Sequence, residues 1–80
     1  MWSTYILLCQ DGTYYTGSTN NVKKRFKDHL EGRGARYTKS HKPVKVIYKI
    51  DFVTKSEALK REAEIKSWSK ARKEELVRFK

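Results

Sequence analysis

Residues 2–17, WSTYILLCQDGTYYTG, contain the strand–turn–strand pattern that decides the fold of this chain. Residues 2–9 form a nearly continuous apolar run, which predicts a strand that is buried on both faces. The dipeptide Asp11-Gly12 is a strong hairpin signal, because a type I′ turn requires positive φ angles. A second strand is expected from about Thr13 to Gly17, so the chain should open with a β-hairpin.

The next part of the chain predicts a helix, a basic loop and a third strand. Residues 18–20 offer N-caps for a helix that runs to about Glu31, and Gly32 is placed to end it. Residues 32–42 have the composition of a basic loop. After Pro43, apolar and polar residues alternate with the period of two that is typical of a strand. The expected apolar face of that strand consists of Val44, Val46, Tyr48, Ile50 and Phe52.

The last third of the chain predicts two helices. Thr54 and Glu57 form a capping box, which opens an amphipathic helix that extends to Trp68. Ser69 can cap a final short helix. The apolar residues of that helix are Leu76, Val77 and Phe79. The order is ββαβαα, which predicts an α+β fold with a small three-stranded antiparallel sheet flanked by helices. A chain of this length should form one domain, residues 1–80.

The composition favours a polyanionic partner. The chain has 80 residues, with 19 Lys and Arg against 9 Asp and Glu, and a formal net charge of +10. On so small a body this charge makes nucleic acid the first candidate partner, ahead of an anionic membrane surface or a ribosome-like assembly. Cys9 is the lone cysteine, so neither an intrachain disulfide nor a cysteine-based metal site is expected.

Glu62 lies on an unexpected face of the predicted helix over residues 54–68. At 100° per residue, the polar face consists of Glu57, Lys60, Glu64 and Ser67. The opposite face consists of Ala58, Leu59 and Ile65, and Glu62 falls among them. An unpaired carboxylate there would be costly. Glu62 should therefore have a basic partner, with Arg61 and Lys66 as candidates, or it should bind a metal ion.

The predicted first helix also places charged or polar side chains beside its apolar residues. Val22, Phe26 and Leu30 define its apolar stripe. Arg25 and His29 lie on one border of that stripe, four residues apart, so both side chains can reach the same point in space. A guanidinium and an imidazole therefore share one edge of the helix, soon after the second strand.

The residues that carry these features match a known family in order and spacing. Ser-Thr-Tyr5 and Tyr15-Thr-Gly17, with nine residues between the tyrosines, resemble the paired motifs of GIY-YIG nucleases. The similarity continues from Gly17 through Arg25 to His29, and again in the segment around Glu62. The chain is identified as a member of the GIY-YIG nuclease superfamily. It is most similar to the small stand-alone bacterial single-domain members, an uncharacterised group.

The resemblance implies catalytic roles for five residues and a structural role for the motif glycine, Gly17. Glu62 matches the family's ligand for a single divalent metal ion, Mg²⁺ or Mn²⁺. Arg25 matches the arginine that steadies the scissile phosphate. Tyr5 and Tyr15 match tyrosines that line the active site, one of them a general base, and His29 matches a histidine that assists a tyrosine. The sequence leaves the choice of general base open, although the glycine two residues on favours Tyr15.

The basic loop is the expected nucleic-acid contact. Its candidate contact residues are Arg33, Arg36, Tyr37, Lys39 and Lys42. The cations would neutralise phosphates. Tyr37 has two alternatives, because it can stack on an exposed base or fold onto the sheet.

Together these observations predict a metal-dependent nuclease that hydrolyses DNA phosphodiester bonds and leaves a 5′-phosphate and a 3′-hydroxyl. Branched and single-stranded DNA are candidate substrates, and RNA is an alternative. The main alternative function is a non-catalytic nucleic-acid-binding module that retains the fold, and a third is a basic structural or interaction protein. We expect a cytoplasmic protein that can associate with the nucleoid, with no membrane and no obligate protein partner.

Overall fold

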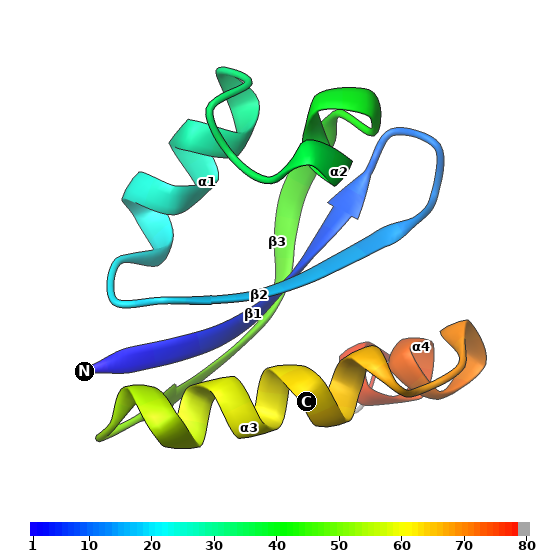
Figure 1. The fold of residues 1–80 in the computed structure, drawn as a ribbon. Helices are drawn as coiled ribbons and strands as arrows, with labels where there is room; N and C mark the ends of the chain where they lie inside the picture. Colours follow the sequence, from blue (N-terminus) through cyan, green and yellow to red (C-terminus); the bar gives the residue numbers. More distant parts are fainter. Residues whose placement is uncertain (79–80) are drawn as a thin grey trace.

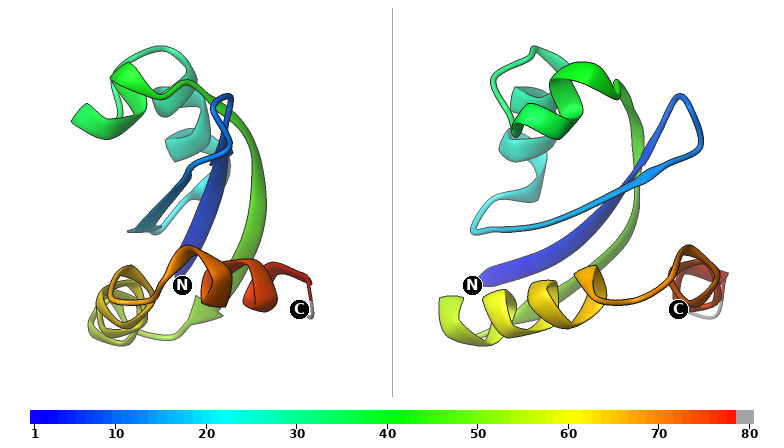
Figure 2. Two further views of the ribbon diagram at one scale, coloured as in Figure 1. Left: turned by 90° about the vertical axis from the view of Figure 1, so that its right-hand side faces the viewer. Right: turned by 45° about the vertical axis from the view of Figure 1, so that its right-hand side comes forward.

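The computed structural model describes residues 1–78. The elements are β1 (Trp2–Cys9), β2 (Tyr14–Thr19), α1 (Val22–Leu30), α2 (Arg36–Ser40), β3 (Pro43–Phe52), α3 (Lys55–Lys66) and α4 (Lys70–Arg78). The strands form one antiparallel sheet in the order β2-β1-β3. Helices α1 and α2 lie on one face of the sheet, and α3 and α4 lie on the other (Figures 1 and 2). The predicted α+β class and three-stranded antiparallel sheet are confirmed.

The hairpin between β1 and β2 is confirmed, but its predicted turn type is wrong. Gly12 has a φ of +83°, and no non-glycine residue within residues 1–78 has a positive φ. A type I′ turn needs positive φ at two successive positions, so Asp11 cannot take part in one. Instead, the Cys9 N–H donates to the Thr13 carbonyl at 2.9 Å, which closes a three-residue loop with Gly12 in the left-handed region. The Asp11 carboxylate accepts from the Thr13 N–H at 3.1 Å and holds this loop.

Helix α1 starts later than predicted because β2 is longer than predicted. Its N-cap is Asn21, whose side chain accepts from the Lys24 N–H at 3.1 Å. Gly32, with a φ of +79°, ends the helix as predicted, and its N–H donates to the His29 carbonyl. Leu30 is 43% exposed, so its predicted place on the packed stripe is wrong. His29 is the one buried residue of α1.

The predicted basic loop over residues 32–42 contains a short helix, α2, which the sequence did not indicate. The observed order is therefore ββααβαα. The His41 N–H donates to the Tyr37 carbonyl at 2.9 Å, and the Thr38 N–H donates to the Ala35 carbonyl at 3.1 Å. Thr38 is buried within this turn of helix. One polar side chain, rather than an apolar stripe, anchors α2, and this is why hydrophobic periodicity missed it.

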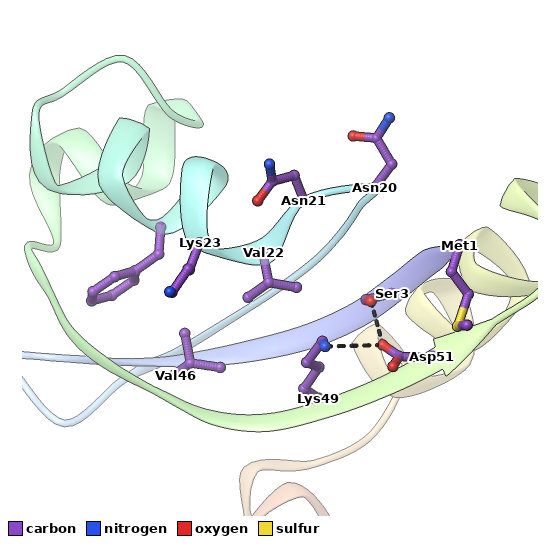
Figure 3. A pocket seen from close by; sticks show the side chains of 10 residues that line it. Met1, Ser3, Asn20, Asn21, Val22, Lys23, Val46, Lys49 and Asp51 are labelled. Atoms are coloured by element: carbon purple, nitrogen blue, oxygen red, sulfur yellow. Dashed lines mark hydrogen bonds and ion pairs between the residues drawn. The ribbon is translucent and has the colours of Figure 1, made fainter.

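Strand β3 contains a bulge that breaks its predicted single apolar face. The pairing with β1 shifts register at Ile47, so this residue is inserted between two regular pairs. Such an insertion changes the face to which the preceding residues point. Tyr48 lies in the core, whereas Val46 lies on the α1 side and lines a cavity with Lys49 and Asp51 (Figure 3). Val46 therefore does not share the face of Tyr48, contrary to the prediction.

Helix α3 begins as predicted, with a capping box in which Thr54 and Glu57 each accept from the other's backbone N–H. Ala58 and Ile65 are fully buried, but Leu59 is 46% exposed, so its predicted place on the packed face is wrong. The helix lies mainly on β1 and β2.

The core lies between the sheet and the two C-terminal helices. Its buried centre is Ile6, Tyr48 and Ile65, and the residues packed against it are Tyr14, Ile47, Trp68, Leu76 and Val77. Leu76 and Val77, two of the apolar residues of the predicted last helix, thus pack inward from α4, while Phe79 lies outside the described residues. Within residues 1–78, no helix is long and apolar enough to cross a membrane.

Candidate active site

Two tyrosines and a histidine form the centre of the site. Antiparallel pairing places Tyr5 of β1 opposite Gly17 of β2, so Tyr5 and Tyr15 lie on the same face of the hairpin. Their ring centroids are 6.4 Å apart. The His29 ring of α1 lies 6.0 Å from the Tyr5 ring and meets the Tyr15 ring edge-on at 5.1 Å. The fold therefore brings together three predicted site residues from three elements.

Gly17 makes this close arrangement possible. A Cβ atom at position 17 would lie 2.6 Å from Tyr5 Oη and 3.1 Å from Tyr15 Cε2. These distances are shorter than ordinary van der Waals contacts, so any side chain at this position would displace a tyrosine. The predicted structural role of the motif glycine has a steric basis here, and it does not depend on an unusual φ.

His29 is held on both sides by buried hydrogen bonds. Its Nε2 lies 2.9 Å from the Tyr5 hydroxyl, and its Nδ1 lies 2.7 Å from Thr38 Oγ1. Burial, followed by the nearby Arg25 guanidinium, lowers the pKa of His29 to about 4. The imidazole is therefore neutral at physiological pH.

Tyr5 is also protonated at physiological pH. Burial raises the pKa of Tyr5 well above its usual value, and charge on Tyr15 and Glu62 raises it further, while the Arg25 guanidinium opposes the rise. The side chain is 1% exposed. Tyr15, by contrast, is only partly buried. Of the two tyrosines, Tyr15 is the one that solvent or a substrate can reach.

Arg25 lies at the open edge of this cluster. Its side chain is 36% exposed, and its nearest carboxylate partner, Asp28, is 4.0 Å away. Asp28 also pairs with Lys24 and Arg33, each at 3.5 Å. The Arg25 guanidinium is thus loosely held by Asp28 and remains available to an anion.

Glu62 pairs with Lys66, one of the two basic partners that the sequence suggested. Its Oε2 lies 2.7 Å from Lys66 Nζ, and its side chain is 18% exposed. Lys66 Nζ in turn lies 6.0 Å from the centroid of the Tyr15 ring. The other candidate partner, Arg61, contacts Glu64 and the Trp68 ring instead. The ion pair of Glu62 and Lys66 therefore borders the tyrosine cluster.

The residues around Glu62 would supply few ligands to a metal ion. Within residues 1–78, no group of three or more His, Cys, Asp or Glu side chains is placed to hold one. Glu62 would therefore contribute a single carboxylate. That donor set fits Mg²⁺ or Mn²⁺, because Mg²⁺ commonly keeps several waters and completes its shell with phosphate oxygens of a substrate.

The basic segment is connected to the site through Tyr37. The Tyr37 ring stacks on Tyr15 at 5.9 Å and on His41 at 4.1 Å, with only 8° between the planes of the latter pair. His41 Nε2 lies 3.5 Å from an Asp11 carboxylate oxygen in the hairpin loop. Of the two alternatives for Tyr37, the structure shows the folded one, against Tyr15.

The predicted nucleic-acid contacts of this segment differ in their surroundings. Arg36, Lys39 and Lys42 are exposed. Arg33 is exposed as well, but it pairs with Asp28 and Glu31. The exposed cations therefore flank the stacked rings of Tyr15 and Tyr37 without joining the buried cluster.

A cavity beside α1 lies away from these residues. It has a volume of about 730 Å³ and lies between α1 and the sheet, over Val22, Phe26 and Val46 (Figure 3). None of the five predicted catalytic residues lines it. Arg25 instead lines a smaller pocket of about 150 Å³ at the start of α1.

Comparison with known proteins identifies the family. The family model of the GIY-YIG catalytic domain matches residues 1–75. The chain belongs to the GIY-YIG family. GIY-YIG domains form a nuclease superfamily, so a nucleic acid is the general class of substrate that membership implies.

Several GIY-YIG relatives are similar over most of their length. A UPF0213 protein of Staphylococcus saprophyticus is 49% identical over 73 residues, which cover 91% of this chain and 89% of that protein. One of Cupriavidus necator is 50% identical, over 90% of this chain and 78% of that protein. The solution NMR structure of a UPF0213 protein from Bacillus halodurans matches with a TM-score of 0.64 at 42% identity, covering 100% of this chain and 86% of that one. The names of these relatives give a protein family and do not state an activity.

Sequence reasoning missed one residue of the site and had a partial signal for another. The sequence contained no signal for Thr38, because this residue lies in the segment that was predicted to be a loop. Lys66 was a candidate partner of Glu62, since the two are four residues apart on a helix. Its position beside Tyr15 depends on how α3 lies against the hairpin, which helical periodicity does not reveal.

Proposed function

We propose that this GIY-YIG protein is a metal-dependent nuclease that hydrolyses DNA phosphodiester bonds. The observation that carries the proposal is the position of Tyr15. Its partly exposed ring lies between the buried pair of Tyr5 and His29 on one side and the ion pair of Glu62 and Lys66 on the other. A phenol in contact with solvent and flanked by an ammonium group suits a general base.

Tyr15 is the better general base of the two tyrosines. A tyrosine hydroxyl is a weak base unless its surroundings favour the phenolate. Tyr5 is buried, its hydroxyl is paired with His29 and its pKa is raised, so it keeps its proton. The Lys66 ammonium group lies 6.0 Å from the centroid of the partly exposed Tyr15 ring, so a positive charge is close to this phenol. This choice agrees with the preference for Tyr15 drawn from the motif glycine.

Arg25 is assigned to the scissile phosphate. Its planar guanidinium can donate to two phosphate oxygens at once, and it is exposed at the edge of the cluster. As the water oxygen bonds to phosphorus, its proton passes to the Tyr15 phenolate. The bond from phosphorus to the 3′ oxygen breaks, and that oxygen takes a proton from solvent. The products are a 5′-phosphate and a 3′-hydroxyl, and Tyr15 returns its proton to solvent.

Glu62 is assigned as the protein ligand of one divalent metal ion. When bound, Mg²⁺ or Mn²⁺ supplies Lewis-acid stabilisation to the charge that develops on the phosphate and the leaving oxygen. The Glu62 carboxylate pairs with Lys66 at 2.7 Å. The metal ion and the Lys66 ammonium group therefore compete for one carboxylate, which predicts weak metal binding before the substrate contributes its own oxygens.

The substrate is proposed to be DNA, held mainly through its phosphates. The net charge of +10 and the exposed Arg36, Lys39 and Lys42 support a strong, salt-dependent attraction to a polyanion. Arg33 would join them if its carboxylate partners released it. Tyr37, already stacked on Tyr15, offers a ring edge near the proposed base. Branched and single-stranded DNA are the candidate forms, and RNA is the alternative polymer.

The direct test is a cleavage assay on several nucleic acids. The protein is incubated with nicked, branched, single-stranded and duplex DNA and with RNA, with Mg²⁺, with Mn²⁺ or with a chelator. Metal-dependent cleavage that leaves 5′-phosphates on at least one DNA supports the proposal. Retarded migration of the same DNAs with no cleavage in any metal contradicts it.

One observation favours the second candidate, a non-catalytic nucleic-acid-binding module. Lys66 neutralises Glu62 without any metal ion, so the carboxylate has a structural use in a protein that only binds. That candidate does not explain why Tyr15, Arg25 and His29 meet at the same place. The proposed nuclease explains both features.

A further inference from the structure

The buried side of the site contains a continuous series of hydrogen bonds that ends at a carbonyl group. Thr38 Oγ1 lies 2.9 Å from the Ala35 carbonyl oxygen and 2.7 Å from His29 Nδ1. A carbonyl oxygen only accepts, and a threonine hydroxyl has a single proton. Thr38 must therefore donate to Ala35. The proton between Thr38 and His29 must then belong to Nδ1.

The same count of protons determines whether the other ring nitrogen, Nε2, carries a proton. A neutral imidazole carries one proton, and burial keeps His29 neutral by lowering its pKa to about 4. With that proton on Nδ1, Nε2 has only a lone pair. The Tyr5 hydroxyl, 2.9 Å away, must donate to it. All three hydrogen bonds therefore run in one direction, from Tyr5 through His29 and Thr38 to Ala35.

The direction of these bonds decides what the Tyr5 oxygen presents to the open side of the site. When its proton points at His29, its lone pairs are free to accept from a donor on the side away from His29. In the other tautomer, Nε2–H would donate to Tyr5, and the Tyr5 proton would have to turn away from His29. The Tyr5 hydroxyl would then face the rest of the site as a donor.

We infer that Thr38 is a positioning residue, which holds His29 as the Nδ1–H tautomer so that the Tyr5 oxygen faces the rest of the site as a hydrogen-bond acceptor. The consequence for cleavage rests on the proposed nuclease function, whereas the tautomer itself does not. Thr38 touches neither the substrate nor the reacting atoms, and it acts through His29 and Tyr5.

The packing around the imidazole agrees with this role. His29 is 1% exposed and Thr38 is 3% exposed, so water is excluded from the Nδ1 side. A Cβ atom at Gly34 would lie 2.1 Å from His29 Nδ1, which shows how closely the backbone before α2 covers the ring. Within residues 1–78, Thr38 Oγ1 is the hydrogen-bond partner of His29 Nδ1. The short helix α2 therefore has a specific use in the site.

The tautomer can be measured directly by NMR. The chain has only two histidines, so long-range proton–nitrogen spectra of histidine-labelled protein are simple to assign. At neutral pH, wild-type protein should show His29 with Nδ1 protonated and Nε2 unprotonated. Thr38→Val removes the acceptor at nearly constant volume, and it should shift His29 toward the Nε2–H form. Thr38→Ser keeps the hydroxyl and should restore the wild-type spectrum.

Thr16 provides a matched control for the same chemical change. It is 3% exposed, as Thr38 is, but its hydroxyl has no hydrogen-bond partner within residues 1–78. It lies in β2, on the strand face opposite to Tyr15 and Gly17. Thr16→Val should therefore leave the His29 tautomer and the cleavage rate unchanged.

Three results would overturn the inference. The first is a wild-type His29 in the Nε2–H form, which decides the matter even if Thr38→Val fails to fold. The second is a folded Thr38→Val protein that retains the Nδ1–H form. The third is an altered tautomer with unchanged cleavage, since the expected loss in kcat is about ten- to a hundredfold, as for other partners that orient a functional side chain. A wild type that cleaves nothing defeats the proposed function, and the spectra still test the tautomer.

Discussion

The two halves of the candidate site differ in burial and in charge. On the α1 and α2 side, Tyr5, His29 and Thr38 are almost fully enclosed and joined by short hydrogen bonds. On the α3 side, Glu62 and Lys66 form an ion pair that is partly open to solvent. Tyr15 contacts both halves. The buried half fixes geometry, and the charged half is the one that can change partners when a substrate or metal ion arrives.

This difference predicts two kinds of variant. Changes in the buried half should lower stability, because they leave polar groups without partners where water cannot replace them. Changes in the charged half should lower activity at little cost in stability, because solvent can hydrate the remaining group.

The largest effect on activity is expected for the tyrosine that both halves share. Tyr15→Phe should lower the single-turnover cleavage rate by about 10² to 10⁴, the range for losing a general base. Tyr5→Phe should lower that rate less. It should also reduce the free energy of unfolding by about 1–3 kcal/mol, because His29 Nε2 loses its buried partner. A Tyr15→Phe protein that cleaves like wild type, beside an inactive Tyr5→Phe protein, would make Tyr5 the base.

The buried half should also make stability depend on pH. The pKa of His29 is about 4 in the folded protein, below the pKa of about 6.5 that a histidine has in an unfolded chain. The unfolded state therefore binds the proton first, so this stability is complete above pH 6.5 and is lost as the pH falls toward 4. The shift corresponds to about 3 kcal/mol at most. Denaturant titrations at each pH should show a steeper loss for wild type than for His29→Gln, and equal slopes would contradict the buried neutral imidazole.

Gly17 tests how tightly the two tyrosines are packed. A methyl group at this position would lie 2.6 Å from Tyr5 Oη, and Tyr5 is enclosed and cannot move away freely. Gly17→Ala should therefore reduce the free energy of unfolding by about 1–3 kcal/mol, the range for overpacking a core. Gly32→Ala is not a clean comparison because of its positive φ, so the control is Asn20→Ala at an exposed position just after β2. An unchanged Gly17→Ala melting curve would show that the tyrosines have room to spare.

A substitution in the charged half should have a smaller effect, and it should strengthen metal binding, whereas the variants above lose activity or stability. Lys66→Met removes the ammonium group that competes for the Glu62 carboxylate, so the affinity for Mn²⁺ should rise by about five- to tenfold, equivalent to about 1 kcal/mol. Paramagnetic broadening of backbone amide signals around Glu62 measures this without any cleavage assay. Lys60→Met, on the exposed face of the same helix, is the control. Equal Mn²⁺ affinities in Lys66→Met and wild type would separate Lys66 from the metal site.

The contrast between the halves also explains what could be predicted from the sequence. Tyr5, Tyr15, Arg25, His29 and Glu62 were predicted as site residues from motif spacing and helical periodicity, which are local properties of the chain. The capping box at Thr54 and the helix end at Gly32 are local for the same reason. These signals sufficed for the family and the fold.

The features that the sequence did not reveal depend on contacts between distant segments. The bulge at Ile47 depends on the pairing of β3 with β1, and α2 is held by a buried hydroxyl that carries no periodic signal. The turn at Gly12 took a three-residue form because the Asp11 carboxylate accepts hydrogen bonds from Thr13. Each of these errors arose where a specific polar contact or strand register outweighed a general propensity.

Glu62→Gln tests the central claim most directly, because the variant separates a metal ligand from a structural ion pair. Glu64→Gln is the control, since Glu64 also pairs with a cation on α3 but lines a pocket with Phe52 and Lys60 rather than the tyrosine cluster. Cleavage and the free energy of unfolding are measured on the same samples. We expect Glu62→Gln to lower metal-dependent cleavage by at least about two orders of magnitude. Its stability should change by less than about 1 kcal/mol, because the Lys66 side chain is 50% exposed and can be hydrated. A Glu62→Gln protein destabilised by about 3 kcal/mol or more, from a wild type that cleaves no nucleic acid, would contradict the nuclease and leave a binding module in its place.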